Sequence, residues 1–133
     1  MAKGTYALIL FLDRSAKVPI GKMGSILFNR GYYVYVGSAM SGLSSRVSRH
    51  LSSAKKTHWH IDFLLKKAKV VGIEMLTSGR KDECRVSLEI ARLAEGSVPQ
   101  FGSSDCRCSS HLHYFSKNPL GKKGFSEVFT KLL

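Results

Sequence analysis

The stretch Gly31–Ala39, GYYVYVGSA, decides the fold that we expect for this chain of 133 residues. Tyrosine and valine alternate over residues 32–36, which is typical of a strand with two filled faces. Gly37 ends the alternation, and a short basic helix is predicted to follow at residues 43–51. Glycine lets the backbone approach a ligand closely, and the forked guanidinium of arginine matches a phosphate group. The strand and the helix after it therefore predict a phosphate-binding site.

The charge balance of the chain is strongly basic. Lysine and arginine number 21 against 9 acidic residues, which gives a formal net charge of +12. A surplus of this size on a small domain indicates a polyanionic partner, with DNA first and RNA not excluded. A ribosome-associated or merely basic protein is the alternative that charge alone leaves open.

The remaining totals describe an ordinary soluble domain. No apolar run is long enough to span a bilayer, and the first residues lead into a strand pattern without a cleavable signal layout. Three cysteines are an odd number and suggest no disulfide framework. We therefore expect a cytoplasmic protein that does not bind membranes.

Hydrophobic patterning predicts one α+β domain over residues 1–133, because strands precede most of the helices. The segment at residues 4–13 is apolar on both faces, as in a central strand. The segment at residues 20–28 is expected to form an antiparallel hairpin with the strand at 32–36. The full set of expected elements is strands at residues 4–13, 20–28, 32–36, 70–76 and 111–115, and helices at residues 43–51, 58–68, 82–94 and 125–133.

Two short motifs resemble those of the GIY-YIG nuclease superfamily. They are Gly4-Thr5-Tyr6 in the first strand and Tyr35-Val36-Gly37 in the strand before the basic helix. Arg46 falls where that superfamily has its phosphate-contacting arginine, and Glu89 falls where it has its metal-binding glutamate. The resemblance implies a small central antiparallel sheet of about three strands flanked by helices.

Further blocks resemble a small branch of that superfamily which in some proteins is fused to an endonuclease III-like DNA glycosylase. The blocks are GSA at 37–39, RVSRHL at 46–51, HWHIDFLL at 58–65 and SDCRCSSHL at 104–112. The resemblance implies a metal-dependent endonuclease that hydrolyses DNA phosphodiester bonds, selects structures or lesions, and acts in DNA repair. It also implies a repair glycosylase as partner, and we expect a monomer or weak dimer.

The resemblance assigns catalytic roles to Tyr6, Tyr35 and Arg46, and a metal-binding role to Glu89. Tyr6 would help to activate water, but an unperturbed tyrosine has a pKa near ~10 and needs an adjacent cation or metal to act as a base. Arg46 is one such cation, and Tyr35 would position the phosphate or the water. Glu89 would bind Mg²⁺ or Mn²⁺ at one site. The plain alternatives are a half-buried strand tyrosine at position 6 and an exposed helical glutamate at position 89.

Other residues are candidates for supporting roles. His58 or His60 could replace a general base, and the alternative is a packed helix start beside Trp59. Gly37 is expected to permit close approach of strand and substrate. The group expected to contact substrate is Gly37, Ser38, Arg49, His50, Lys55 and Lys56.

Thiolates and imidazoles near the end of the chain suggest a second kind of site. Zinc at Cys106, Cys108 and His111 is the lesser alternative, because Cys-x-Cys is tighter than the usual zinc knuckle. We expect instead that Asp105 and Cys106 stabilise a loop, and that Cys84 lies in the core.

Two other function classes stay open. One is a nucleic-acid-binding module on the same scaffold without turnover. The other is a zinc-stabilised interaction domain.

Overall fold

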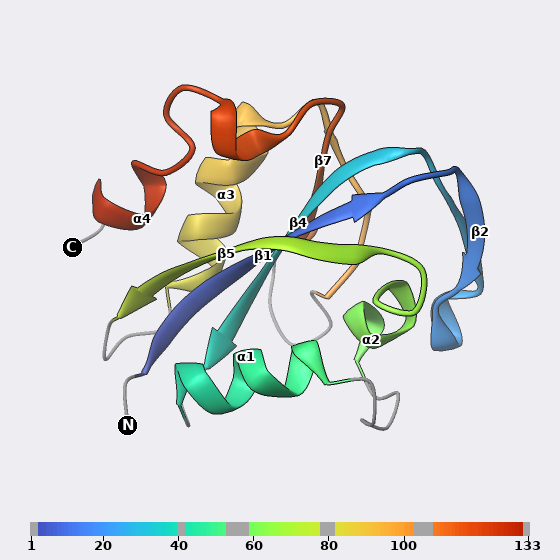
Figure 1. Cartoon of the computed structure of the whole chain (residues 1–133), viewed down its shortest axis with the longest axis horizontal. Helices are drawn as coiled ribbons and strands as arrows, with labels where there is room; N and C mark the ends of the chain where they lie inside the picture. Colours follow the sequence, from blue (N-terminus) through green and yellow to red (C-terminus); the bar gives the residue numbers. More distant parts are fainter. Residues whose placement is uncertain (1–2, 40–41, 53–58, 78–81, 103–107, 132–133) are drawn as a thin grey trace.

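The computed structural model describes residues 3–39, 42–52, 59–77, 82–102 and 108–131. In chain order its elements are (Figure 1): β1 Gly4–Leu12, β2 Ala16–Pro19, the 3₁₀ turn η1 Gly21–Met23, β3 Ser25–Phe28, β4 Gly31–Ala39, α1 Leu43–Leu51, α2 His60–Leu64, β5 Lys69–Thr77, α3 Glu83–Leu93, β6 Gly96–Ser97, β7 Leu112–Phe115, the 3₁₀ turn η2 Pro119–Gly121 and α4 Val128–Lys131. The α+β class is confirmed.

The main sheet is antiparallel and has five strands in the order β5-β1-β4-β7-β6. The expected size of about three strands is therefore wrong. Two strands extend the sheet beyond β5, β1 and β4, and the outer one, β6, has only two residues. Backbone hydrogen bonds from Glu95 N to Tyr114 O and from Val98 N to Leu112 O, each 2.9 Å, flank β6. Because β6 is short, exposed and held by backbone hydrogen bonds, its sequence carries no hydrophobic pattern that would predict a strand.

The expected hairpin between residues 20–28 and 32–36 is also wrong. β3 pairs with β2 in a separate two-stranded ribbon, and β4 pairs with β1 over nine residues. Both β1 and β4 are apolar on two faces, so each buries most surface when it is central in the sheet. The ribbon extends from the end of the β1–β4 pair (Figure 1).

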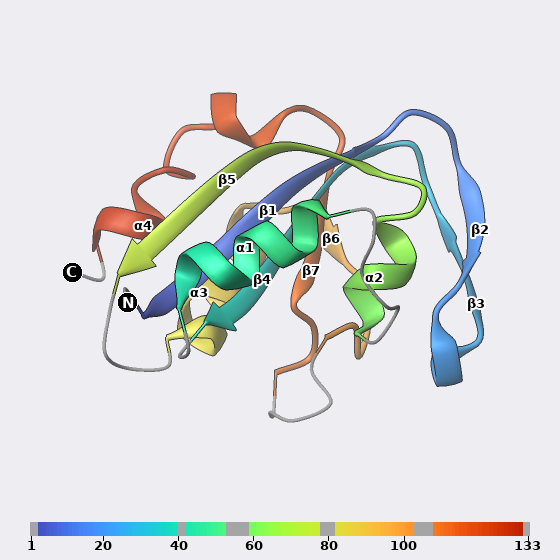
Figure 2. The same ribbon diagram turned by 60° about the horizontal axis from the view of Figure 1, so that its bottom comes forward.

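Alternation of side chains divides the core into two layers. Tyr6, Leu8 and Leu10 of β1 face a core shared with α1 and α2. Ala7 and Ile9 face the opposite core, which α3 and α4 cover. Figure 2 shows α1 and α2 in front of the sheet and α3 behind it. Side chains that project from α1 and from the middle of α3 are therefore separated by the sheet.

Among the described residues, no helix has the length and apolar character needed to cross a membrane.

Candidate functional site

A buried tyrosine and histidine lie at the centre of the candidate site. Tyr6 Oη lies 2.6 Å from His50 Nε2, and the two residues are only 1% and 2% exposed. His50 reaches the core because it follows Leu43 and Val47 at helical spacing on the inner face of α1. The contact therefore joins β1 to α1 through a hydrogen bond between two polar side chains inside the core.

Tyr35 completes an aromatic cluster around this pair. Its ring centroid lies 6.4 Å from that of Tyr6 and 6.1 Å from that of His50. Burial raises the pKa of both tyrosines above the ordinary value, and the nearby Arg46 partly opposes the rise. The negative charge of Glu83 raises both pKa values further. Both phenols are therefore protonated at neutral pH. Either phenol would give up its proton only to an acceptor close by.

Arg46 lies beside the tyrosines at the rim of the site. Its Nη1 donates a hydrogen bond of 3.3 Å to the carbonyl oxygen of Ser38, and its guanidinium carbon lies 4.6 Å from the ring centroid of Trp59. Arg49 stacks on Trp59 too, at 4.2 Å. These contacts fix the orientation of two guanidinium groups next to the end of β4.

Arg49 is held by a carboxylate. Its Nη1 and Nη2 donate to the two oxygens of Asp62, each at 3.1 Å, and Asp62 also accepts a 2.8 Å hydrogen bond from Trp59 N. A bidentate pair of this kind is both strong and directional. Arg49, which we expected to contact substrate, is thus also a tie between α1 and the start of α2.

Gly37 is needed because the ring of Tyr6 lies over it. The two residues face each other in the register of β1 and β4. A Cβ at position 37 would lie 2.3 Å from Tyr6 Oη and 2.4 Å from its Cζ. The expected close approach at this glycine is therefore made by the catalytic tyrosine candidate itself.

Gly37→Ala is expected to lower the free energy of unfolding by about 1–3 kcal/mol, because the Tyr6 ring must move away from a buried position. Gly96→Ala is the control, since a Cβ at position 96 meets nothing within 4 Å. Urea unfolding of both variants measures the difference. Equal midpoints for the two variants would contradict the close packing of Tyr6 on Gly37.

The structure does not bring Glu89 together with these residues. Glu89 lies on α3, where its carboxylate pairs with Arg92 at 2.8 Å. The acidic residues whose charges reach both tyrosines are Glu83, in the first turn of the same helix, and Asp62, which pairs with Arg49. Six residues correspond to about 9 Å along a helix axis. Glu83 is the carboxylate that the sequence interpretation missed.

His60 packs against residues 101–102, and the Ser38 side chain lies near the end of β4. His60 Nδ1 accepts a 2.9 Å hydrogen bond from Gly102 N, its ring packs on Phe101, and burial lowers its pKa. The Ser38 hydroxyl is buried and has no hydrogen-bond partner within the described part of the chain. The predictions for Lys55, Lys56 and His58 lie outside the described residues.

Cys84, Cys108 and His111 form a second cluster, on the α3 side of β4. Their sulfur and nitrogen atoms all lie within 4.8 Å of one another, so the three residues could bind a metal ion. Cys84 is not in the core as expected; it is partly exposed because it lines a pocket of about 560 Å³. Cys106 and Asp105, which we also considered, lie outside the described residues.

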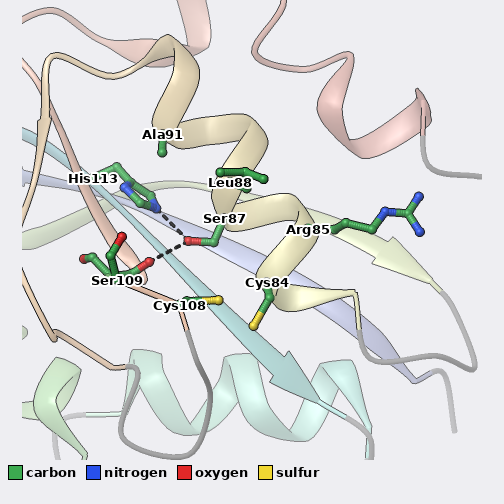
Figure 3. Close-up of a pocket in the computed structure, with 9 residues that line it drawn as sticks. Cys84, Arg85, Ser87, Leu88, Ala91, Cys108, Ser109 and His113 are labelled. Carbon is green, nitrogen blue, oxygen red and sulfur yellow. Dashed lines mark hydrogen bonds between the residues drawn. The ribbon is translucent and has the colours of Figure 1, made fainter.

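The pocket next to this cluster has a fixed polar wall (Figure 3). Ser87 Oγ lies 2.7 Å from His113 Nε2 and donates to Ser110 O at 2.9 Å. Outside the residues drawn, Ser97 Oγ lies 2.6 Å from His113 Nδ1. Burial lowers the pKa of His113 to about 4, and the nearby His111 makes a smaller contribution in the same direction. His113 is therefore a neutral structural group with both ring nitrogens engaged.

The chain belongs to the family described as "Domain of unknown function DUF123", whose model matches residues 5–133. Comparisons with curated proteins and with solved structures each give no match.

Proposed function

We propose that this domain is a metal-dependent endonuclease of GIY-YIG type that hydrolyses DNA phosphodiester bonds. The observation that carries the proposal is the 2.6 Å contact between Tyr6 Oη and His50 Nε2, beside the guanidinium of Arg46. A buried phenol with a proton acceptor on one side and a cation on the other is suited to proton transfer. The net charge of +12 supports a polyanionic substrate.

The proposed chemistry is attack of water on phosphorus. A P–O bond forms to the water oxygen, and the P–O bond to the leaving sugar oxygen breaks; that oxygen keeps the electron pair and takes a proton from solvent water. Tyr6 Oη takes a proton from the water while its own proton passes to His50 Nε2. This relay avoids a free tyrosinate, which the raised pKa of Tyr6 disfavours.

Arg46 would stabilise the charge that develops on the phosphate oxygens. Its guanidinium is held by the Ser38 carbonyl and by Trp59, so little reorganisation is needed when a phosphate binds. Tyr35 packs on Tyr6 and His50 and would keep both rings in position.

Oxygen donors at the start of α3 fit a hard divalent ion such as Mg²⁺ or Mn²⁺. Glu83 supplies one carboxylate, and the preceding Asp82 has a buried oxygen, Oδ2, without a hydrogen-bond partner among the described residues. When bound, such an ion would supply positive charge for the phosphate and the leaving oxygen. Glu83 therefore replaces Glu89 as the ligand that we propose.

Burial of the tyrosines favours a second candidate function, a nucleic-acid-binding module without turnover. Tyr6 is 1% exposed and its pKa is raised, so water must gain access before it can react. Arg46 and the basic surface would still contact phosphates in such a module.

The test of the proposal is cleavage of labelled duplex, single-stranded, flap, abasic and junction DNAs with Mg²⁺ or Mn²⁺. We expect Glu83→Gln to lose most of the cleavage, because its carboxylate is replaced by a neutral amide. Glu89→Gln is the matched control and should retain it, since that carboxylate pairs with Arg92 instead.

Binding is measured on the same DNAs over a range of salt concentrations. Salt-sensitive binding without cleavage of any form would favour the binding module, because phosphate contacts alone weaken with salt. Equal cleavage by Glu83→Gln and wild type would contradict the proposed role of Glu83.

A further inference from the structure

Three soft or borderline donors converge from separate parts of the chain, directly beside Glu83 of the proposed nuclease centre. Cys84 lies in the first turn of α3, Cys108 lies in the segment before β7, and His111 lies directly before β7. Figure 3 shows the two cysteine sulfurs directed toward the same space beside the pocket. Cys108 and His111 follow Cys84 by 24 and 27 positions, yet all three present ligand atoms to one point.

The spacing of these atoms matches tetrahedral coordination. With Zn–S bonds of ~2.3 Å and a Zn–N bond of ~2.0 Å, adjacent ligands lie about 3.6–3.8 Å apart. Cys84 Sγ lies 3.8 Å from His111 Nε2, and no two of the three ligand atoms are more than 4.8 Å apart. An ion would therefore need only small movements of the side chains.

The ring of His111 is already oriented for a metal. Its Nδ1 lies 3.1 Å from the carbonyl oxygen of Val36, which can only accept a hydrogen bond, so Nδ1 carries the proton. The lone pair is then on Nε2, the nitrogen that faces Cys84. A Glu83 oxygen lies 3.8 Å from the same Nδ1. Metal-binding histidines commonly have such an acceptor behind them.

The donor set decides which ion the cluster would select. Cys84 lies in the first turn of α3, where the N-terminal end of the helix dipole is compatible with an anionic ligand. Two thiolates and an imidazole select Zn²⁺ over Mg²⁺ or Mn²⁺, which prefer oxygen.

We propose that Cys84, Cys108 and His111 bind one zinc ion, with the fourth coordination position open to the adjacent pocket. The ion fixes the first turn of α3 to the segment before β7 and, through Val36, to β4. It therefore also holds Glu83, the neighbour of Cys84, against the end of the sheet. This site uses other ligand atoms than that of the hard divalent ion, although Glu83 lies beside both, and it does not depend on nuclease activity.

The test begins with wild-type protein purified under reducing conditions. Elemental analysis is expected to find one zinc ion per chain. After removal by a chelator, titration with Co²⁺ should give thiolate-to-cobalt charge-transfer absorption and the visible bands of a tetrahedral site. A large excess of Mg²⁺ should not remove these bands. The proposal would be overturned if the reduced wild-type protein bound less than one zinc or cobalt ion per chain through its thiolates.

Variants then identify the ligands. Cys84→Ser and Cys108→Ser are each expected to weaken Co²⁺ binding by more than about 100-fold. Removal of a group that only contacts a ligand costs up to that much. Ser109→Ala is the control, because Ser109 lines the same pocket without offering a soft donor. Unchanged Co²⁺ spectra in both cysteine variants would assign the metal elsewhere and contradict the site.

Circular dichroism shows whether each cysteine variant is folded before the titration. If a variant does not fold, zinc release from the wild-type protein on thiol modification replaces it. Release of one zinc ion as two thiols react supports the site. Retention of zinc after modification of both thiols, or a disulfide between Cys84 and Cys108 in the reduced protein, overturns it.

Discussion

Arg46→Ala is expected to reduce DNA cleavage about 100-fold or more, which is the effect of removing one pre-positioned group that stabilises charge in a transition state. The guanidinium is half-buried, stacked on Trp59 and hydrogen-bonded to the Ser38 carbonyl, so it is held beside Tyr6 before substrate binds. Loss of these contacts should lower the free energy of unfolding by only about 1 kcal/mol. Cleavage rates and urea unfolding of the same preparation separate the two effects.

Arg14→Ala is the matched control for charge. Arg14 is exposed and lies between β1 and β2, in a segment that carries no residue of the α3 metal site. Both variants lose one positive charge, so both should weaken general attraction to DNA to a similar small degree. A cleavage rate that falls equally in the two variants would show that Arg46 acts through charge alone and would remove it from the proposed centre.

Asp62→Asn is expected to lower the free energy of unfolding by about 2–3 kcal/mol. The Asp62 side chain is 1% exposed and accepts two hydrogen bonds from Arg49 and one from Trp59 N. Breaking a buried ion pair from one side costs about 3–5 kcal/mol, and the partial exposure of Arg49 reduces that cost. Urea unfolding at fixed ionic strength measures the change.

Glu89→Gln is the control for this variant, because it also breaks a carboxylate–arginine pair in a helix. That pair is more exposed, so its loss should change the free energy of unfolding by less than about 1 kcal/mol. Asp62→Asn should also disturb the Arg46–Trp59 contact, since Asp62 fixes the backbone of Trp59. An unfolding midpoint equal to that of wild type would contradict the proposed tie between α1 and α2.

Much of the architecture followed from alternation in two strands. Residues 4–12 and 31–39 are apolar on both faces, and they form the paired centre of the sheet. The pairing of β3 and the presence of β6 could not be predicted in the same way. β6 consists of two exposed residues held by backbone hydrogen bonds. The pairing of β3 with β2 depends on how the whole two-stranded ribbon folds.

The candidate site was predictable for two strand residues and one residue of α1, and less so on α3. The sequence indicated Tyr6, Tyr35 and Arg46, and the fold brings them to one end of β1 and β4. On α3 the sequence offered two glutamates, and only packing decides that Glu83 lies near the tyrosines.

Two further contacts had no local signal because each joins segments distant in the chain. The Tyr6–His50 contact spans 44 residues, and the Cys84–His111 contact spans 27 residues. Helical spacing does place His50 on the inner face of α1, beside Leu43 and Val47, and this could have identified it as a buried group. Convergence of Cys84 with His111 depends on how α3 packs on the sheet.

The central claim is that Tyr6, His50, Arg46 and Glu83 form a metal-dependent centre for phosphodiester cleavage. The most direct measurement is the rate at which wild-type protein cleaves the labelled DNA panel with Mn²⁺, with and without a chelator. We expect cleavage of at least one DNA form that stops on chelation and returns when Mn²⁺ is restored. Salt-sensitive binding to these DNAs without cleavage under any of these conditions would contradict it.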